Sequence, residues 1–257
     1  DPDGAGDIVA THYSVDGGAE ELYGAPFTVS GDDNHVVAFW TEDQAGNRDT
    51  PARTVAINID ATAPTLTFDA AVPAANSQGW NSTSVEIAYT TADNFSGVAS
   101  AVPSTPLLFG SEGAGQTRTV VVTDEAGNSA SFTTTAINID FTAPSISASP
   151  SVAALWPPNN KLTPDVISGQ IADGGSGIDP STATFVVLDE YGAIQPTGPV
   201  AIDADNHYSF TLLLEASRLG DDREGRRYEI VLTARDRASN PFTTSTLVSV
   251  PHDQGGQ

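Results

Sequence analysis

Residues 117–139 read TRTVVVTDEAGNSASFTTTAINI, and they determine the fold class. Apolar and polar residues alternate on both sides of the central TDEAGN, as is typical of β-strands with one buried face. Gly127 and Asn128 tolerate positive φ, and the Asp124 carboxylate can close a turn on the backbone amides that follow it. The stretch therefore predicts a β-hairpin.

The same organisation occurs twice more in the chain. The turns TEDQAGN at 41–47 and ARDRASN at 234–240 also lie between alternating segments. A second element, INIDATAP at 57–64, recurs as INIDFTAP at 137–144. Asp60 and Asp140 are 80 residues apart, and Asp43 and Asp124 are 81 apart. Two elements that repeat at nearly one period predict a tandem array of similar domains.

The composition agrees with an all-β chain and excludes several kinds of function. Of the 257 residues 39% are hydrophobic, there is no Cys, and the formal net charge is −23. Thr, Ser, Val and Ala suit strands, and the absence of Cys excludes disulfides and thiolate metal sites. So negative a surface repels phosphate groups, so we expect neither nucleic-acid binding nor membrane insertion. No apolar run reaches the length of a membrane span.

The repeats predict three domains joined by short linkers. Each Ala-Pro step favours extended backbone and separates one strand from the next. The predicted domains are residues 1–60, 61–140 and 141–257, the last one larger than the others. Linkers of a few residues predict restricted bending between neighbours, and hence an elongated array.

These motifs resemble the immunoglobulin-like domain repeats of bacterial adhesins and other secreted or surface proteins. The I-D-x-T-A-P linkers and T-D-x-A-G-N hairpins carry the resemblance, together with YSVDGG at 13–18 and APFTV at 25–29. LWPPNNK at 155–161 and the final VSVPHD resemble C-terminal modules of the same kind. The resemblance implies tandem immunoglobulin-like β-sandwich domains, and it implies no particular activity.

The first domain is predicted to be incomplete. In the second domain about thirty residues precede the acidic turn Asp93–Gly97, whereas the matching turn Asp3–Asp7 stands almost at the first residue given. A sandwich without its first strands exposes a strand edge and part of its core. We interpret the chain as a piece of a longer one; the alternative is that strands of a neighbouring chain complete the domain.

Acidic residues are the candidate metal ligands. Asp1, Asp3 and Asp7 alternate with other residues in a Gly-rich loop, which suits oxygen coordination of Ca²⁺. The resemblance implies calcium at domain junctions, and there it points to Asp43, Asn47, Asp60, Asp124, Asn128 and Asp140. Asp236 is not assigned a site, because Ser239 replaces glycine in its turn and no such linker follows it. Asp and Asn are also ordinary turn residues without any metal.

Catalytic motifs are absent from the sequence. The four His are scattered and fit no metal-ligand spacing, and no G-x-S-x-G elbow occurs. The predicted function is therefore a non-catalytic structural or stalk segment of a secreted or cell-surface bacterial protein, stiffened by calcium. The alternatives are a subunit of an extracellular fibre completed by strand exchange, with copies of itself as partners, and a carbohydrate-binding appendage of an exported enzyme. Only Trp40, Trp80 and Trp156 are available as tryptophans for stacking on surface glycans.

Overall fold

The protein is a tandem β-sandwich chain, as the sequence predicts. The computed structural model describes residues 7–253, and these contain strands and turns but no α-helix. The described residues contain no helix that is long and apolar enough to cross a membrane.

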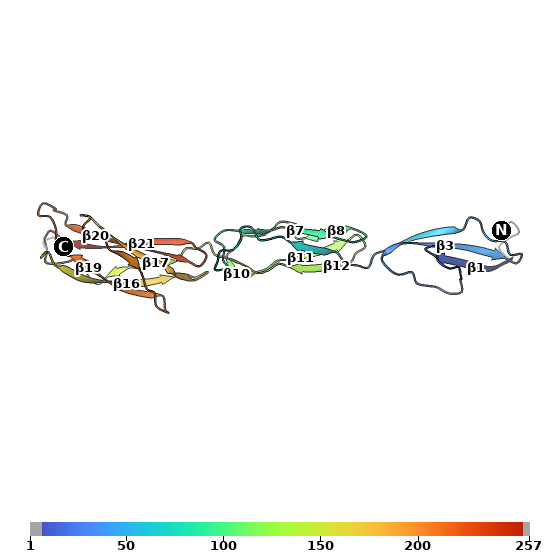
Figure 1. Cartoon of the computed structure of the whole chain (residues 1–257), viewed down its shortest axis with the longest axis horizontal. Helices are drawn as coiled ribbons and strands as arrows, with labels where there is room; N and C mark the ends of the chain where they lie inside the picture. Colours follow the sequence, from blue (N-terminus) through green and yellow to red (C-terminus); the bar gives the residue numbers. More distant parts are fainter. Residues whose placement is uncertain (1–6, 254–257) are drawn as a thin grey trace. The chain divides into compact units, whose positions relative to one another are not determined.

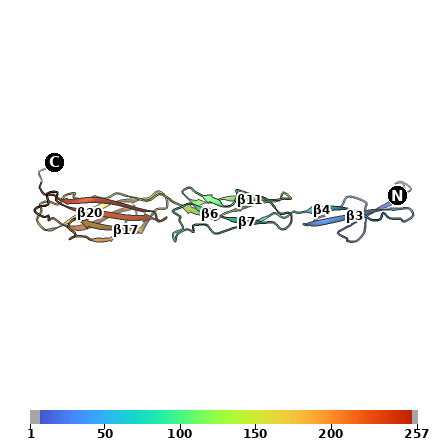
Figure 2. The same cartoon turned by 90° about the horizontal axis from the view of Figure 1, so that it is seen from above.

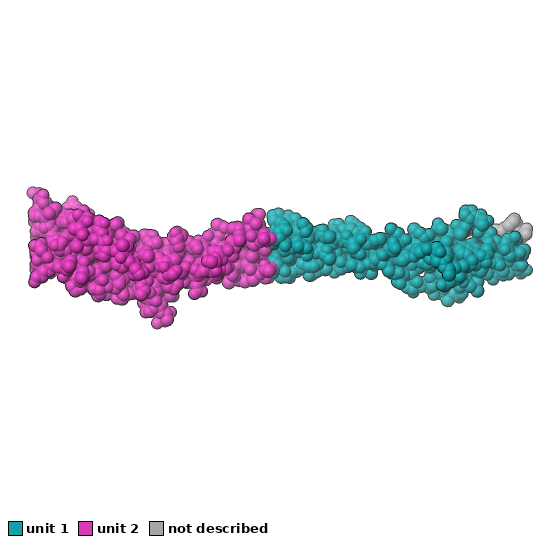
Figure 3. All heavy atoms as spheres, viewed as in Figure 1, with its two compact units in different colours: residues 1–69, 88–107, 118–134 teal, residues 70–87, 108–117, 135–257 magenta. Residues whose placement is uncertain are grey.

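The chain divides into two compact units (Figure 3). The first consists of residues 1–69, 88–107 and 118–134, and the second of residues 70–87, 108–117 and 135–257. The predicted middle domain, 61–140, contributes to both units. The three-domain division therefore stays a prediction.

The first unit contains three sheets. Four strands form the sheet nearest the N-terminus, in the order β2-β1-β3-β4, and two smaller sheets have the orders β5-β7 and β12-β11-β8. The strands are β1 (Ile8–Val15), β2 (Glu21–Leu22), β3 (Asp33–Asp43), β4 (Arg53–Ile59), β5 (Thr65–Phe68), β7 (Tyr89–Ala92), β8 (Val98–Val102), β11 (Thr119–Asp124) and β12 (Ser129–Thr133).

The hairpins of this unit form where the sequence predicts them. β11 and β12 pair antiparallel from Thr119 opposite Thr133 to Thr123 opposite Ser129. β3 and β4 pair from Asp33 opposite Ile59 to Phe39 opposite Arg53, and they lie side by side in both views (Figures 1 and 2). Positive φ at Gly46 (81°) and Gly127 (97°) permits both turns.

The second unit contains the strands of the predicted third domain and part of the second. Its sheets have the orders β6-β9, β10-β13, β14-β16-β15 with β19 paired to β16, and β18-β17-β20-β21. The strands are β6 (Val85–Ile87), β9 (Leu107–Phe109), β10 (Gly113–Gln116), β13 (Ile137–Ile139), β14 (Ser145–Ile146), β15 (Ser149–Pro150), β16 (Leu162–Ala172), β17 (Ile178–Asp189), β18 (Thr197–Pro199), β19 (His207–Glu215), β20 (Arg226–Asp236) and β21 (Pro241–Val250).

Residues 146–250 of the predicted third domain share one hydrophobic core between two layers of strands. One layer contains β16 and β19, and the other contains β17, β20 and β21. Alternate residues of both layers are buried against one another, and they include Ile167 and Leu214 from the first layer and Ile230, Leu232 and Val248 from the second. Because every second residue of each strand contributes, the burial follows the period of two that the sequence displays.

Two valines in the second strands of related hairpins differ in burial. Val55 lies opposite Val37 in the β3–β4 hairpin, and Val248 lies opposite Tyr228 in the β20–β21 hairpin. Val55 is 50% exposed, whereas Val248 is fully buried. The same residue type therefore lies in two different environments.

Truncation of these two valines is expected to give unequal losses of stability. Val248→Ala removes two buried methyl groups and should lower the free energy of unfolding of the third domain by about 2 kcal/mol. Val55→Ala should change the first domain by less than about 0.5 kcal/mol, because the side chain is half exposed. Hydrogen exchange measured in increasing urea resolves the two domains, and equal losses would contradict the difference in burial.

A buried ion pair joins the ends of β17 and β20. The Arg226 guanidinium, 1% exposed, donates from Nε and Nη2 to the two Asp189 carboxylate oxygens at 2.9 and 2.6 Å. Its Nη1 donates to Glu215, and the group lies over the rings of Tyr191 and Tyr228. Burial alone would raise the pKa of Asp189, but hydrogen bonds from Arg226 and from backbone amides outweigh it and lower the pKa to about 2.

This pair predicts an acid limit for the third domain. The folded pKa of Asp189 lies below the unfolded value, so its stabilisation is present above about pH 4 and is lost as the pH falls towards 2. The expected loss is about 2 kcal/mol. Urea unfolding at pH 5 and at pH 2.5 measures it. In Asp189→Asn the difference between the two pH values should shrink by about that amount, and an unchanged difference would contradict the assignment.

Candidate cation sites

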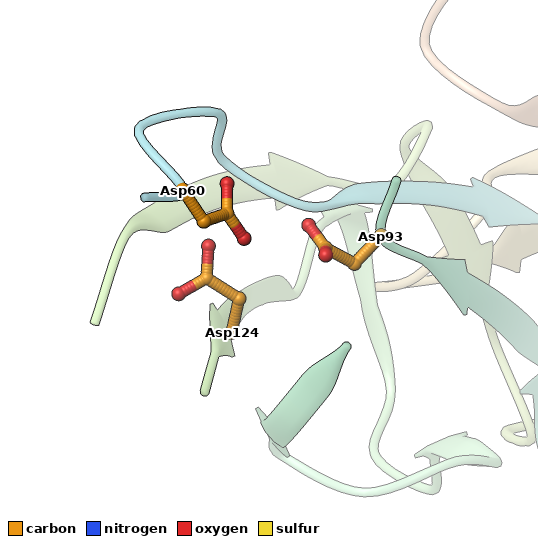
Figure 4. A group of neighbouring side chains, drawn as sticks. All are labelled: Asp60, Asp93 and Asp124. Atoms are coloured by element: carbon orange, nitrogen blue, oxygen red, sulfur yellow. The ribbon is translucent and has the colours of Figure 1, made fainter. Parts of the chain in front are cut away.

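Three aspartates converge at the end of β4. Asp60 directly follows that strand, Asp93 follows β7, and Asp124 ends β11. One carboxylate oxygen of each lies within 4.8 Å of the other two, and Figure 4 shows the three carboxylates pointing toward one another. The linker residue of one repeat thus meets two turns that are about 30 and 60 residues further along the chain.

Backbone amides hold this cluster in place. Asp93 Oδ2 accepts hydrogen bonds from the amides of Phe95 and Gly97, both at 2.9 Å. Asp124 Oδ1 accepts from the Asn128 amide at 2.8 Å. Asp60 Oδ2 accepts from the Ser96 amide at 3.0 Å. Asp93 and Asp124 are therefore fixed by their own turns, and Asp60 is held by the Asp93 turn.

A second cluster, of Asp140, Asp173 and Asp236, has the same hydrogen bonds. Its oxygens also lie within 4.8 Å of one another. Asp173 Oδ2 accepts from the amides of Gly175 and Gly177, Asp236 Oδ1 from the Asn240 amide, and Asp140 Oδ2 from the Ser176 amide. Asp140 and Asp173 follow Asp60 and Asp93 by 80 residues each, so the cluster is a repeated feature of the chain.

The second cluster is the more deeply buried. Asp140 and Asp236 are each 1% exposed. A Cβ at residue 175 would lie 2.4 Å from Asp140 Oδ2, so glycine there admits the close approach of the carboxylate. Burial raises the pKa of Asp236, hydrogen bonds from Asn240 oppose the rise, and the charges of Asp140 and Asp173 add to it.

Each cluster has an unsatisfied acceptor. Asp93 Oδ1 and Asp173 Oδ1 are buried and have no hydrogen-bond partner. Within residues 7–253, none of the six aspartates takes part in an ion pair with a basic side chain. A buried carboxylate oxygen without a donor is costly unless a cation binds it. Three carboxylates fit the all-oxygen ligand set of Ca²⁺.

The structure brings several of the predicted ligands together. Asp60 and Asp124 share the first cluster, and Asp140 belongs to the second. Asn128 Nδ2 donates to Asp124 Oδ2 and to the Asp60 carbonyl, so in this arrangement it orients the two aspartates. A direct bond from Asn128 to a metal stays a prediction.

The candidates of the first repeat are not joined to either cluster. Asp43 accepts from the amide and side chain of Asn47, as Asp124 does from Asn128. Asp7 Oδ1 is buried without a partner, and the Asp7 carbonyl accepts from the Gln44 amide. Asp1 and Asp3 lie outside the described residues.

Sequence reasoning did not assign Asp93, Asp173 and Asp236 as ligands. Asp93 and Asp173 each precede a glycine by four residues and are 80 residues apart. This spacing equals that between Asp60 and Asp140, and it could have identified them as repeated site residues. Ser239 takes φ of 77°, close to the value at Gly46, so the replacement of glycine does not alter the Asp236 turn. Asp236 lies beside Asp140. Asp140 belongs to the linker before the predicted third domain, so no linker after that domain is needed.

Comparisons with known proteins found distant likenesses among solved structures only. No protein-family model matches the chain, and neither does any curated protein. Among solved structures, the tetra-tandem repeat in the extending region of a large adhesion protein is 19% identical with a TM-score of 0.34, covering 96% of this chain and 67% of that one. The fibronectin(III)-like modules of Clostridium thermocellum CbhA are 15% identical, with a TM-score of 0.31 and coverage of 73% and 94%. Protocadherin gammaB7 EC3-6 is 12% identical, with a TM-score of 0.38 and coverage of 95% and 69%.

Proposed function

We propose that the chain is a non-catalytic structural segment of a secreted or cell-surface protein, in which Ca²⁺ stiffens the connections between successive β-sandwich domains. The supporting observation is the repeated three-aspartate cluster. In each cluster one carboxylate belongs to a linker, and the other two belong to turns of the domain that follows it.

A cation in such a cluster couples the linker to the domain. Asp60 is held to the following repeat by the Ser96 amide and by Asn128, which donates to its carbonyl. Ca²⁺ shared by all three carboxylates would add bonds that break when the linker swings away. Without the cation, three like charges in a partly buried site repel one another and favour opening. The proposed mechanism is therefore mechanical.

Enzymatic activity has no support among the described residues. His12 and His35 pair with the carboxylates of Glu20 and Asp16 between β1 and β2, and Arg226 pairs with Asp189 in the interior. The two clusters consist of aspartates alone and contain no His or other basic side chain that could exchange a proton with them. We therefore assign the clusters a structural role.

Carbohydrate binding is the weaker candidate. A sugar platform needs exposed aromatic rings that lie side by side, whereas Tyr13 and Phe27 stack on each other with ring centroids 4.0 Å apart. Trp156 is 42% exposed and Trp40 stacks on His12. No coplanar pair among the described residues favours this function.

Small-angle X-ray scattering with light scattering, in excess Ca²⁺ and then in excess chelator, tests the proposal. We expect a monomer whose maximum dimension and rigidity fall on chelation. The matched variant Asp60→Asn/Asp140→Asn should behave in Ca²⁺ as the unaltered chain does in chelator, since the amides preserve the turns. A monomer that is indifferent to chelation would contradict the calcium-stiffened segment.

A further inference from the structure

The first sheet carries an open apolar groove on one face. The groove has a volume of about 530 Å³, and its lining includes Tyr13, Phe27, Phe39, Val55 and Ile57. Val55 is 50% exposed and Phe27 is 39% exposed. A continuous open apolar face of this kind on a sheet points to a missing layer.

The middle repeat shows what occupies the corresponding place. Residues 105–109, TPLLF, match residues 25–29, APFTV, at the 80-residue spacing. In the middle repeat Leu107–Phe109 forms β9 and pairs with β6, and Leu107 and Phe109 are each 2% exposed. β6 contributes Val85 and Ile87, which are also buried.

Residues 27–29 in the first repeat have no such partner strand. They are not part of a strand, and within residues 7–253 no backbone hydrogen bond joins them to another segment. Their backbone groups and the apolar groove therefore form one continuous surface. It offers unpaired backbone groups beside an apolar groove, which is what an added β-strand needs.

The connectivity indicates where the partner comes from. In the second and third repeats, the acidic turns at Asp93 and Asp173 directly follow β7 and β16, and β16 lies in the layer that covers the core. Asp3 precedes the first residue of β1 by five residues, as Asp93 precedes the first residue of β8, and Ile8 and Val98 lie opposite Asp43 and Asp124. A segment joined to Asp3 would therefore hold the same position in the first repeat as β7 and β16 hold in the second and third repeats.

A second copy of the chain is a poorer occupant. The strands that could be donated, β6 and β16, are already paired and buried in their own repeats. In addition, two chains of net charge −23 repel each other.

We propose that the apolar groove and the backbone groups of residues 27–29 accept β-strands from a segment that precedes Asp3 in the parent polypeptide. The segment has about thirty residues, with apolar side chains at alternate positions as in Val85–Ile87. One of its strands pairs with residues 27–29, as Val85–Ile87 pairs with Leu107–Phe109 in the middle repeat. The inference does not depend on calcium, because it rests on the groove and not on the clusters.

An extended chain tests this assignment. Residues 61–92 replace Asp1 and Pro2, so that Asp3 follows them as Asp93 does in the unaltered sequence. We expect the amides of residues 27–29 to exchange about 100-fold more slowly. Binding of a fluorescent apolar dye to the groove should be lost. In the matched control the same extension carries Val85→Asp and Ile87→Asp, and it should give neither effect.

Three outcomes would overturn the proposal. The extension could leave exchange at residues 27–29 unchanged, or the control extension could protect them equally. The third outcome is that the unextended chain dimerises in sedimentation equilibrium and that the amides of residues 27–29 are protected in the dimer. A second copy of the chain would then be the occupant of the groove. Exchange of β20 serves as the internal reference, because the third domain lies outside the alteration.

Discussion

Saturating Ca²⁺ is expected to raise the stability of the chain towards heat, and a single Asp173→Asn substitution is expected to remove the part contributed by the second cluster. A ligand that binds only the folded state stabilises it by about 2.7 kcal/mol at a free concentration 100 times its Kd, and by about 4.1 kcal/mol at 1,000 times. Calorimetric melting in Ca²⁺ and in chelator measures the shift. In Asp173→Asn the shift of the third-domain transition should be lost.

Asp203 provides the matched control. Asp203 Oδ1 accepts from the amides of Asp205 and His207, so it closes the same kind of turn as Asp173, but it belongs to neither cluster. Asp203→Asn should therefore retain the full response to Ca²⁺. If both variants retained it, the Asp173 cluster would not be the site.

The response to Ca²⁺ should also depend on pH. Burial raises the pKa of Asp236 in the folded state, so without a cation its ionisation destabilises the fold as the pH rises above the ordinary carboxyl pKa. Ca²⁺ offsets this cost at neutral pH. As the pH falls towards the range in which Asp236 binds a proton, protons compete with Ca²⁺ and the stabilisation should decrease.

Arg226→Met is expected to destabilise the third domain by about 3–5 kcal/mol. The substitution leaves the buried Asp189 carboxylate without its bidentate partner, and an uncompensated buried charge has a cost of this size. Hydrogen exchange of peptides from β16–β21 in increasing urea measures the loss for this domain alone.

Arg227→Met is the control for loss of charge and of side-chain length. Arg227 pairs with Glu224 at 3.0 Å, but both side chains are more than half exposed, so its removal should change stability by less than about 1 kcal/mol. Adding Asp189→Asn to Arg226→Met removes the orphaned charge and should restore part of the loss. Equal effects of Arg226→Met and Arg227→Met would show that the buried pair is not a determinant of stability.

Much of the fold follows from local sequence pattern. The alternation around Asp124 predicts β11 and β12, and the matching turns at Asp43 and Asp236 predict the other two hairpins, which the structure contains. These hairpins depend on residues close together in the sequence. The division into compact units depends on packing between distant strands, which the hairpin pattern does not encode.

The cation clusters are only partly predictable for the same reason. Asp60 and Asp140 are conspicuous because they lie in repeated linkers. Asp93 and Asp173 look like ordinary turn residues until the fold brings them beside the linkers. What distinguishes them is the buried Oδ1 without a donor, a property of three-dimensional packing that composition and spacing do not reveal.

Terbium luminescence tests the central claim, the binding of a cation by these clusters, most directly. Trp80 and Asp140 line the same pocket of about 410 Å³, so Tb³⁺ bound to the second cluster should be excited through Trp80. The account predicts emission that saturates with Tb³⁺, is displaced by Ca²⁺, and is lost in Trp80→Phe and in Asp173→Asn but not in Asp203→Asn. Absence of sensitised emission, or emission that persists in Asp173→Asn, would contradict it.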